Sequence, residues 1–358
     1  MNKKILMITL HNTDNCGSSL QAYALQKALI NLDYDSKLID YNPNYIKYNG
    51  NKARYFVRCV IHAVSSYKRY KKFKKFKNEY LLTTESSYKN INELRNANFD
   101  ADCYITGSDQ LWNTMYMCGK DSAFYLDFCD KKKIAYAVSL GRKIIPRDNI
   151  EMINRYINNF EWVSFREKSS YNQIKQMAKH ASYVCDPVLL NGIQEYRKIQ
   201  SPVKYNFKYI LVYVAQAVER EKLDKLIKKL GNNYKIIFVG SYRKRCNCDI
   251  HIKDMGPLEF LSLIDNAEFV VSNSFHATAF SIIYKKQFVT ILPDENGERI
   301  EDLMELVGIK GHTVSSTELS DYTYSTIDDI KYEEISANIK NIAENSKKLL
   351  IEHIGENK

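Results

Sequence analysis

A histidine in the second half of the chain stands where two sequence patterns meet. The apolar run 269–271 is followed by the polar residues Ser272 to Ser274, and apolar residues then recur with helical spacing up to position 282. This pattern predicts a strand, a turn and a helix with His276 in its first turn. Because the first amides of such a helix attract anions, His276 is a candidate for contact with a bound anion. The alternative is a histidine that only caps or packs the helix start.

A second candidate turn lies near the N-terminus, where residues 11–21 read HNTDNCGSSLQ after an apolar run. Gly17 permits a tight turn, and Ser18 or Ser19 can cap the following helix while offering donors to an oxyanion. The segment lacks the glycine spacing of dinucleotide-binding and P-loop motifs. A capped helix with no ligand is the competing interpretation.

A third polar turn, residues 107–113 with the sequence GSDQLWN, follows another apolar run. Ser108, Asp109, Gln110 and Trp112 suit the wall of a sugar or anion pocket. In the alternative interpretation Asp109 caps a helix and Trp112 belongs to the core.

Arg166 also comes directly after a predicted strand, residues 162–165. Its planar guanidinium matches the geometry of carboxylate and phosphate groups, so it is a candidate for binding a substrate that carries both. The alternative is an arginine in a surface ion pair.

These turns need a scaffold that brings strand ends together, and the alternation of short apolar runs with helical patterns predicts parallel sheets. The chain has 358 residues, which is longer than most single domains. Strand–helix alternation lapses near residues 190–207 and then starts again. We therefore expect an α/β protein with two Rossmann-like domains facing a cleft: residues 1–195, residues 205–330, and a C-terminal helix, 331–358, that crosses back.

Composition narrows the class of protein further. The formal net charge is +10, and every residue from Tyr67 to Lys77 is aromatic or cationic. This run predicts an amphipathic basic helix, which either packs its aromatic residues on its own domain or contacts an anionic membrane or acidic polymer. No nucleic-acid recognition motif accompanies the charge, so we expect no nucleic-acid partner.

The eight cysteines and the N-terminus carry simple expectations. Cys246 and Cys248 form the only close pair, so we expect reduced thiols and no metal site. The first apolar run, residues 5–10, is too short for a signal peptide or a membrane span. We expect a cytoplasmic protein.

Taken together, the turns resemble those of the polysaccharide pyruvyl transferase family. The resemblance extends from about residue 3 to residue 308 and is most specific at Gly107–Gln110 and Ser274–His276. It is carried by NCGSSLQAYAL (15–25), GSDQLWN (107–113), SFRE (164–167), CDPVLL (185–190), SNSFHATAFS (272–281) and RIEDL (299–303). One departure is Ala277, where many members have glycine.

The resemblance implies a GT-B-like fold and transfer of pyruvate from phosphoenolpyruvate to two sugar hydroxyls as a ketal, in cell-surface polysaccharide biosynthesis. That reaction needs a proton on the methylene carbon of the donor and cationic groups for its carboxylate and phosphate. His276 falls on the family's histidine and would supply the proton, since bound anions favour a protonated imidazole. Arg166 falls on a family arginine expected at the donor. No cofactor is implied, because phosphoenolpyruvate is a co-substrate.

The same resemblance assigns the remaining candidates. Donor contacts are expected from Asn273, Ser274, Arg299, Ser18 and Ser19, and acceptor contacts from Asn15, Gly17, Ser108, Asp109, Gln110 and Trp112. The acceptor would be a sugar or a lipid-linked oligosaccharide, reached at the inner membrane face through residues 67–77. Two other functions stay open: a GT-B glycosyltransferase that uses a nucleotide sugar, and a non-catalytic carbohydrate- or anion-binding protein.

Overall fold

The computed structural model describes residues 2–47, 63–142, 144–202, 205–231, 233–240, 243–294, 296–319, 321–322 and 329–357. The chain divides into two compact units, each built on its own sheet. Unit 1 contains Met1–Cys59, Phe73–Asn191 and Lys340–Lys358, and unit 2 contains Val60–Lys72 and Gly192–Ile339.

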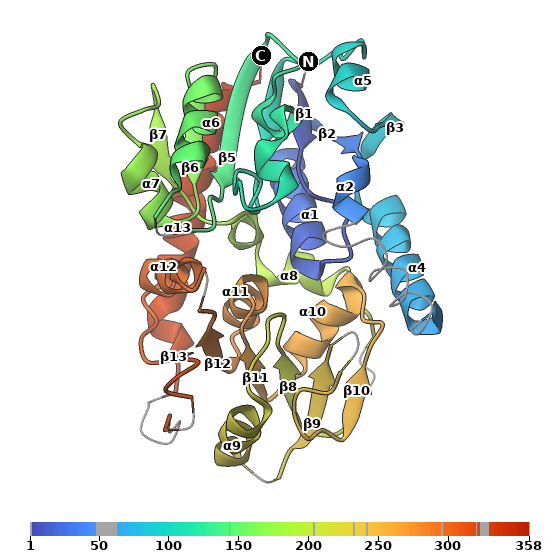
Figure 1. Ribbon diagram of the computed structural model, residues 1–358, viewed down its shortest axis with the longest axis vertical. Helices are drawn as coiled ribbons and strands as arrows, with labels where there is room; N and C mark the ends of the chain where they lie inside the picture. Colours follow the sequence, from blue (N-terminus) through green and yellow to red (C-terminus); the bar gives the residue numbers. More distant parts are fainter. Residues whose placement is uncertain are drawn as a thin grey trace. The chain divides into compact units, whose positions relative to one another are not determined.

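Unit 1 is a seven-stranded, fully parallel sheet with the strand order β3-β2-β1-β4-β5-β6-β7 (Figure 1). The strands are β1 (Lys4–Ile8), β2 (Asp35–Tyr41), β3 (Thr83–Tyr88), β4 (Cys103–Thr106), β5 (Lys132–Val138), β6 (Trp162–Phe165) and β7 (Ala181–Tyr183). The connecting helices are α1 (Cys16–Asn31), α2 (Asn44–Lys47), α5 (Ile91–Arg95), η1 (Met117–Lys120), η2 (Ser122–Tyr125), α6 (Arg147–Ile157), α7 (Lys168–Ile174) and η3 (Pro187–Leu190). A further helix, α4 (Ala63–Tyr80), is divided, since its residues up to Lys72 belong to unit 2 and those from Phe73 belong to unit 1.

Unit 2 is a six-stranded parallel sheet with the order β10-β9-β8-β11-β12-β13. Its strands are β8 (Tyr209–Tyr213), β9 (Lys235–Val239), β10 (Ile250–Ile252), β11 (Phe269–Ser272), β12 (Gln287–Leu292) and β13 (Thr313–Ser315). Its helices are α8 (Ile193–Arg197), α9 (Arg220–Leu230), α10 (Pro257–Asp265), α11 (Phe275–Ile283), α12 (Glu298–Val307) and the first part of α13 (Tyr332–Ile354).

The predicted fold class is confirmed, because both sheets are parallel and both alternate strands with helices. The sequence pattern predicts strands at residues 4–9, 37–41, 101–106, 133–139, 162–165, 183–185, 209–214, 235–239, 268–272 and 288–292, and each of these segments coincides with or overlaps an observed strand. Three edge or short strands, β3, β10 and β13, have no counterpart in the prediction. β3 reads TTESSY, and all six of its residues are exposed or only partly buried, so it has no apolar run by which it could be recognised.

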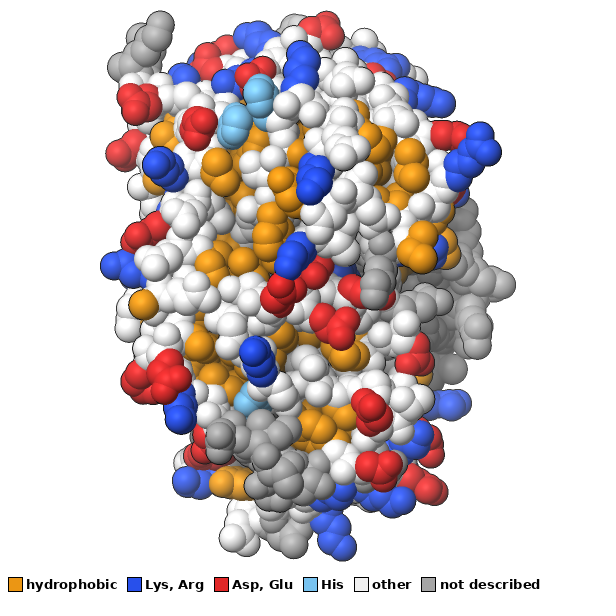
Figure 2. Space-filling model, turned by 90° about the vertical axis from the view of Figure 1, so that its left-hand side faces the viewer, with side chains coloured by type: hydrophobic (Ala, Val, Ile, Leu, Met, Phe, Trp, Pro, Cys, Tyr) orange, Lys and Arg blue, Asp and Glu red, His pale blue; other side chains and the backbone are white. Residues whose placement is uncertain are grey.

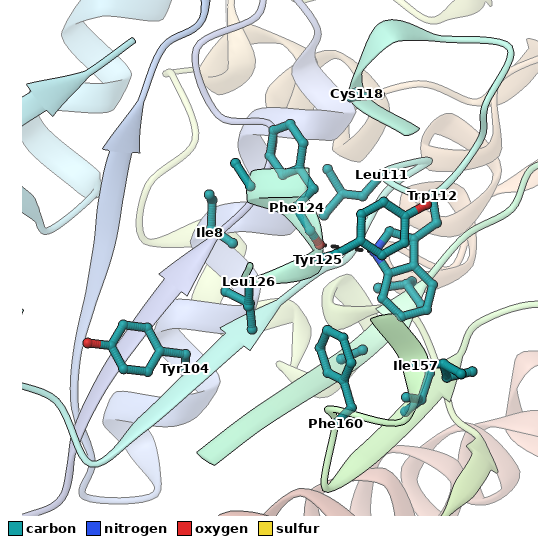
Figure 3. Close-up of a cluster of buried hydrophobic side chains, with 14 of the residues drawn as sticks. Ile8, Tyr104, Leu111, Trp112, Cys118, Phe124, Tyr125, Leu126, Ile157 and Phe160 are labelled. Atoms are coloured by element: carbon teal, nitrogen blue, oxygen red, sulfur yellow. Dashed lines mark hydrogen bonds between the residues drawn. The ribbon is translucent and has the colours of Figure 1, made fainter. Parts of the chain in front are cut away.

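The core of unit 1 is rich in aromatic side chains (Figure 3). The Trp112 ring stacks on Tyr125 with 5.0 Å between ring centroids and meets Phe160 edge-on at 5.5 Å. The indole N–H of Trp112 donates to the Phe124 carbonyl at 3.0 Å, so the polar atom of this fully buried ring is satisfied. This packing anchors the loop that follows β4.

The last helix, α13, belongs to both units in sequence: residues up to 339 cluster with unit 2, and residues from 340 cluster with unit 1. The residues after α13 are bound to residues that precede β1 and β2. The Lys3 amide donates to Asn357 at 2.8 Å, and the Tyr34 hydroxyl donates to the Gly355 carbonyl at 3.0 Å. The two chain termini therefore lie within the same unit (Figure 1).

Charged groups of both signs are mixed over the face drawn in Figure 2, where basic and acidic side chains lie near one another. The charges of α4 are not mixed in this way, because the segment from Tyr67 to Lys77 contains basic residues and no acidic residue. Within the residues that the structure describes, no helix is both long and apolar enough to cross a membrane.

Candidate functional site

Each sheet has one point where its strand order reverses direction. In unit 1 the chain moves from β1 to β2 on one side and later returns to β4 on the other, and in unit 2 β8 and β11 hold the same relation. Ligands of open α/β sheets bind beyond the carboxyl ends of the strands at such switch points. The loops predicted from the sequence to carry chemistry follow β1 and β4 in unit 1 and β11 in unit 2.

A pocket of about 390 Å³ lies at the switch point of unit 1. It brings together four residues predicted from the sequence: Asn15 and Ser18 after β1, and Asp109 and Gln110 after β4. Its other lining residues are Leu10, Thr13, Asp14, Tyr45, Tyr116, Met117 and Cys118. Among the described residues that line it, two are aspartates and none is lysine, arginine or histidine, so the pocket suits hydroxyl groups better than anions.

Asp109 is held firmly at this pocket. Its carboxylate accepts hydrogen bonds from the Ser18 hydroxyl at 2.6 Å and from the Gln110 amide at 2.9 Å. Its backbone adopts a left-handed conformation, φ +71°, and its carbonyl accepts from the amides of Leu111 and Ser139. Such a conformation is uncommon for residues other than glycine and persists where the surroundings fix it.

The same loop needs a glycine at position 107, two residues before Asp109. Its φ is +125°, and an added Cβ would lie 2.0 Å from the Tyr136 carbonyl oxygen. Ser108 follows with its side chain fully buried, and its hydroxyl lies within hydrogen-bond distance of the Ala137 carbonyl at 2.9 Å and of Asp186 at 3.1 Å. The loop is thus packed against β5 and cannot shift without breaking these contacts.

Arg166 is buried behind the pocket among three carboxylates. Its guanidinium pairs with Asp186 at 2.6 Å, Glu167 at 3.1 Å and Asp109 at 3.6 Å, and its side chain is 0% exposed. Burial alone would lower the pKa of Arg166, but the three carboxylates outweigh it and hold this pKa above its ordinary value. This geometry does not place Arg166 at the surface of a donor site. The alternative, an arginine in a surface ion pair, is wrong, because the Arg166 side chain is fully buried.

A second polar network fixes the loop after β1. His11 bonds the Thr9 carbonyl at 3.0 Å through Nδ1 and Asp40 at 3.2 Å through Nε2, and Asp40 also accepts from Asn12 and Lys77. Burial raises the pKa of Asp40, but these hydrogen bonds outweigh it and hold the pKa well below its ordinary range. The network ties the end of β2 to the loop that lines the pocket.

The other predicted residues of unit 1 have supporting positions. Asn15 caps α1 by accepting from the Gly17 and Ser18 amides, at 2.8 and 3.4 Å. Ser19 is buried in the first turn of α1, and Trp112 lies in the core, as its alternative interpretation had it. The Ser19 and Trp112 side chains are buried, so their positions do not support direct contact with a ligand, whereas the exposed Asn15 lines the pocket.

In unit 2 the predicted residues lie at the switch point between β8 and β11. Asn273 accepts from the amides of Ala215 and Gln216, at 2.7 and 3.3 Å, and so connects the loops after the two strands. Ser274 is the N-cap of α11, with its hydroxyl 3.5 Å from the Ala277 amide. His276 is therefore in the first turn of α11, as predicted, and is 8% exposed.

Arg299 lies in the first turn of α12, which follows β12 in the chain. Its guanidinium carbon is 6.0 Å from the centre of the Phe275 ring, next to His276 in sequence, and its Nε lies 3.4 Å from the Asn296 carbonyl. The structure thus brings a cation to the first turn of α11, within unit 2 and from a separate element.

Several residues of the pocket were not predicted from the sequence. Tyr45, Tyr116 and Met117 line it, and Met115, Tyr116 and Met117 are among the exposed large apolar residues of the chain. Cys118 also lines it, and burial, with a smaller contribution from Asp109, raises the pKa of its thiol to about 12. In the sequence, the only indication of these pocket residues is the apolar run Met115–Met117, which shows no strand or helix pattern.

The chain carries no obvious metal centre in the parts that the structure describes, since no group of three or more His, Cys, Asp or Glu side chains there could hold an ion.

The fold of the chain is similar to that of several solved structures. It resembles a Staphylococcus aureus MnaA–UDP complex, with a TM-score of 0.59, 12% identity, and coverage of 98% of this chain and 96% of that one. It also resembles a putative UDP-N-acetylglucosamine 2-epimerase from Listeria monocytogenes, with a TM-score of 0.56, 10% identity, and coverage of 96% of this chain and 91% of that one. These likenesses define a GT-B-like fold of two Rossmann-like units.

The family follows from sequence. The sequence model of the polysaccharide pyruvyl transferase family matches residues 15–295, and the chain belongs to this family. The resemblance identified from the turns is thereby confirmed. Among curated proteins, none matches the chain in sequence.

Proposed function

We propose that this protein transfers pyruvate from phosphoenolpyruvate to two hydroxyl groups of a sugar, forming a ketal in cell-surface polysaccharide synthesis. The observation that carries the proposal is the family match over residues 15–295, which includes the polar loops after β4 and β11 at the two switch points. In the overall reaction two sugar O–H protons are lost. One is balanced by the proton added to the methylene carbon, and the other leaves with phosphate.

The donor is assigned to the switch point of unit 2. Phosphoenolpyruvate carries a carboxylate and a phosphate, and a helix N-terminus with a nearby cation stabilises such groups. The first turn of α11 and Arg299 supply both features, and Asn273 and Ser274 fix the loop that leads into α11. His276 would donate the proton that turns the methylene group of the donor into a methyl group, which makes the neighbouring carbon electrophilic.

The acceptor is assigned to the pocket of unit 1. Its acidic and amide side chains can bind hydroxyl groups, and the rings of Tyr45 and Tyr116 suit the apolar face of a sugar. The lack of a cationic side chain among its described lining residues separates it from the donor site. Asn15, Asp109 and Gln110 are the acceptor contacts predicted from the sequence that line it.

Ligand binding tests the assignment of the donor. A ligand that binds only the native state raises the melting temperature, so phosphoenolpyruvate should stabilise the protein in scanning calorimetry. Arg299→Gln should remove most of that shift, while Arg243→Gln, at an exposed arginine elsewhere in unit 2, should keep it. Stabilisation by UDP- or GDP-sugars and not by phosphoenolpyruvate would instead favour a nucleotide-sugar glycosyltransferase. Binding of a sugar without turnover would favour a binding protein.

We further propose that α4 holds the protein at an anionic membrane surface on the cytoplasmic side, where a lipid-linked acceptor would be found. The packed side of α4 carries Phe73 and Phe76, which are buried. Lys72 is 2.9 Å from Glu259, and Lys77 is 2.7 Å from Asp40, so both cations have partners within the protein.

The opposite side of α4 is the basic face, which consists of Tyr67 and four exposed lysines: Lys68, Lys71, Lys74 and Lys75. These residues recur three or four positions apart, which places them along one side of the helix. Lys71 lies 4.6 Å from the centre of the Tyr67 ring, and Tyr67 is 56% exposed. Each cation near an anionic bilayer contributes about 1 kcal/mol, so the four lysines together can contribute about 4 kcal/mol at low salt.

A further inference from the structure

We infer that Asp109 is the carboxylate that takes the proton from the attacking sugar hydroxyl, and that Arg166 and Ser18 are positioning residues that hold it in place. The inference rests on the proposed function and deepens it. It assigns the buried arginine a role different from the donor contact expected from the sequence.

Position within the pocket supports this assignment. Asp109 lines the acceptor pocket, its side chain is 13% exposed, and it lies in the loop after β4, the central strand of the sheet. The other lining carboxylate, Asp14, is exposed on the loop after β1. A base that must meet a hydroxyl at one angle works best on a rigid support, and Asp109 has that support.

The contacts of Asp109 hold its carboxylate at both oxygens. Ser18 donates to Oδ2, the Gln110 amide donates to Oδ1, and the Arg166 Nη2 lies 3.6 Å from Oδ1. A carboxylate offers about four lone-pair sites, so it can accept several hydrogen bonds at once. The partners fix the direction of the oxygens, and Arg166 is fixed in turn by Asp186 and Glu167.

The chemistry requires only a modest base. Once the methylene carbon is protonated, the adjacent carbon is cationic, and the hydroxyl oxygen becomes acidic as its C–O bond forms. Carboxylates perform the same task in glycosidases, where water or a sugar oxygen attacks an oxocarbenium-like centre. In the step assigned here, the O–H bond breaks, its electron pair stays on the oxygen that attacks carbon, and the proton moves to Asp109. This proton then leaves with the departing phosphate.

Two variants test the role of Asp109 in the full-length protein with phosphoenolpyruvate and a sugar acceptor. Asp109→Asn keeps the shape of the side chain and one acceptor oxygen but cannot take a proton, so kcat should fall by about 10²- to 10⁴-fold. The stabilisation by phosphoenolpyruvate should persist. Asp109→Gly suits the left-handed backbone, and added formate should restore its turnover at least partly, because formate can occupy the vacated space as a base.

Chloride at the same ionic strength is the matched control and should restore nothing, since it is a far weaker base. A folded Asp109→Asn protein with near-normal kcat would overturn the inference, as would an Asp109→Gly protein that responds equally to formate and chloride. If the wild-type protein itself releases no phosphate from phosphoenolpyruvate with any acceptor, the proposed function fails first, and the role of Asp109 fails with it.

Discussion

Replacing Arg166 by methionine should destabilise unit 1 strongly. The substitution keeps an unbranched, apolar chain in place of the arginine's methylene groups but leaves Asp186, Glu167 and Asp109 without their shared cation. Asp186 and Glu167 are 2% and 1% exposed, so water cannot replace the guanidinium. Removing one partner of a buried ion pair costs about 3–5 kcal/mol. For a unit of this size that corresponds to a fall of roughly 6–20 °C in Tm.

An exposed ion pair of similar length in the same unit is the matched control. Arg95 lies 2.7 Å from Asp127, but their side chains are 49% and 33% exposed. Because exposed pairs contribute about 0–1 kcal/mol, Arg95→Met should change Tm by only a few degrees. Differential scanning calorimetry of both variants makes the comparison.

A double variant separates buried charge from lost packing. Asp186→Asn in the Arg166→Met background removes one of the unpaired carboxylates and should recover part of the lost stability, by about 0.5–3 kcal/mol of coupling. If Arg166→Met unfolds within 1 kcal/mol of the wild type, the cluster does not stabilise unit 1 as reasoned here. If Arg166→Lys instead weakens phosphoenolpyruvate binding with no loss of Tm, then Arg166 contacts the donor, as expected from the sequence.

Three further predictions concern other parts of the molecule. His276→Asn should lower kcat by about 10²- to 10⁴-fold while the protein stays folded, and near-normal turnover would remove His276 from the mechanism. Replacing the four lysines of the basic face by glutamine should abolish sedimentation with anionic liposomes at low salt. The control variant replaces four exposed lysines elsewhere by glutamine and should still sediment with the liposomes; these are Lys225, Lys228, Lys310 and Lys348. A membrane role for α4 would be excluded if the wild type does not bind the liposomes, or if both variants lose binding equally. Asp40 has a lowered folded pKa, so it stabilises the native state above its unfolded pKa of about 3.9 and less as the pH falls below this value. Asp40→Asn should therefore reduce the free energy of unfolding at pH 7, and a difference from the wild type that does not shrink below about pH 4 would contradict this interpretation.

Much of the fold follows from local sequence patterns, because buried parallel strands are short apolar runs. The strands Trp162–Phe165 and Lys235–Val239 were predicted with their observed bounds. β3 escaped because its polar residues lie at the sheet edge, where hydrogen bonds to β2 decide the structure and side-chain burial does not. Edge strands of this type have no hydrophobic periodicity to recognise.

The site was only partly predictable for a related reason. Which loops carry polar groups could be inferred from strand ends, and four of those residues do line one pocket. The partners of Arg166 could not, because Asp186 comes 20 residues later and Asp109 belongs to another strand's loop. Similarly, the hydrogen bond between Ser18 and Asp109 spans 91 positions. Such pairings depend on sheet order, which local spacing does not determine.

The most direct test of the proposed function is a turnover assay with the purified full-length protein, phosphoenolpyruvate and a panel of simple glycosides that carry neighbouring or 1,3-related hydroxyl pairs. Phosphate release is followed continuously, and the product is examined by NMR for the methyl group of a pyruvate ketal. We expect phosphate release that depends on a glycoside, with one ketal methyl signal for each phosphate. Release of UDP or GDP from a nucleotide sugar, with no ketal formed from phosphoenolpyruvate on any glycoside, would contradict the proposed function.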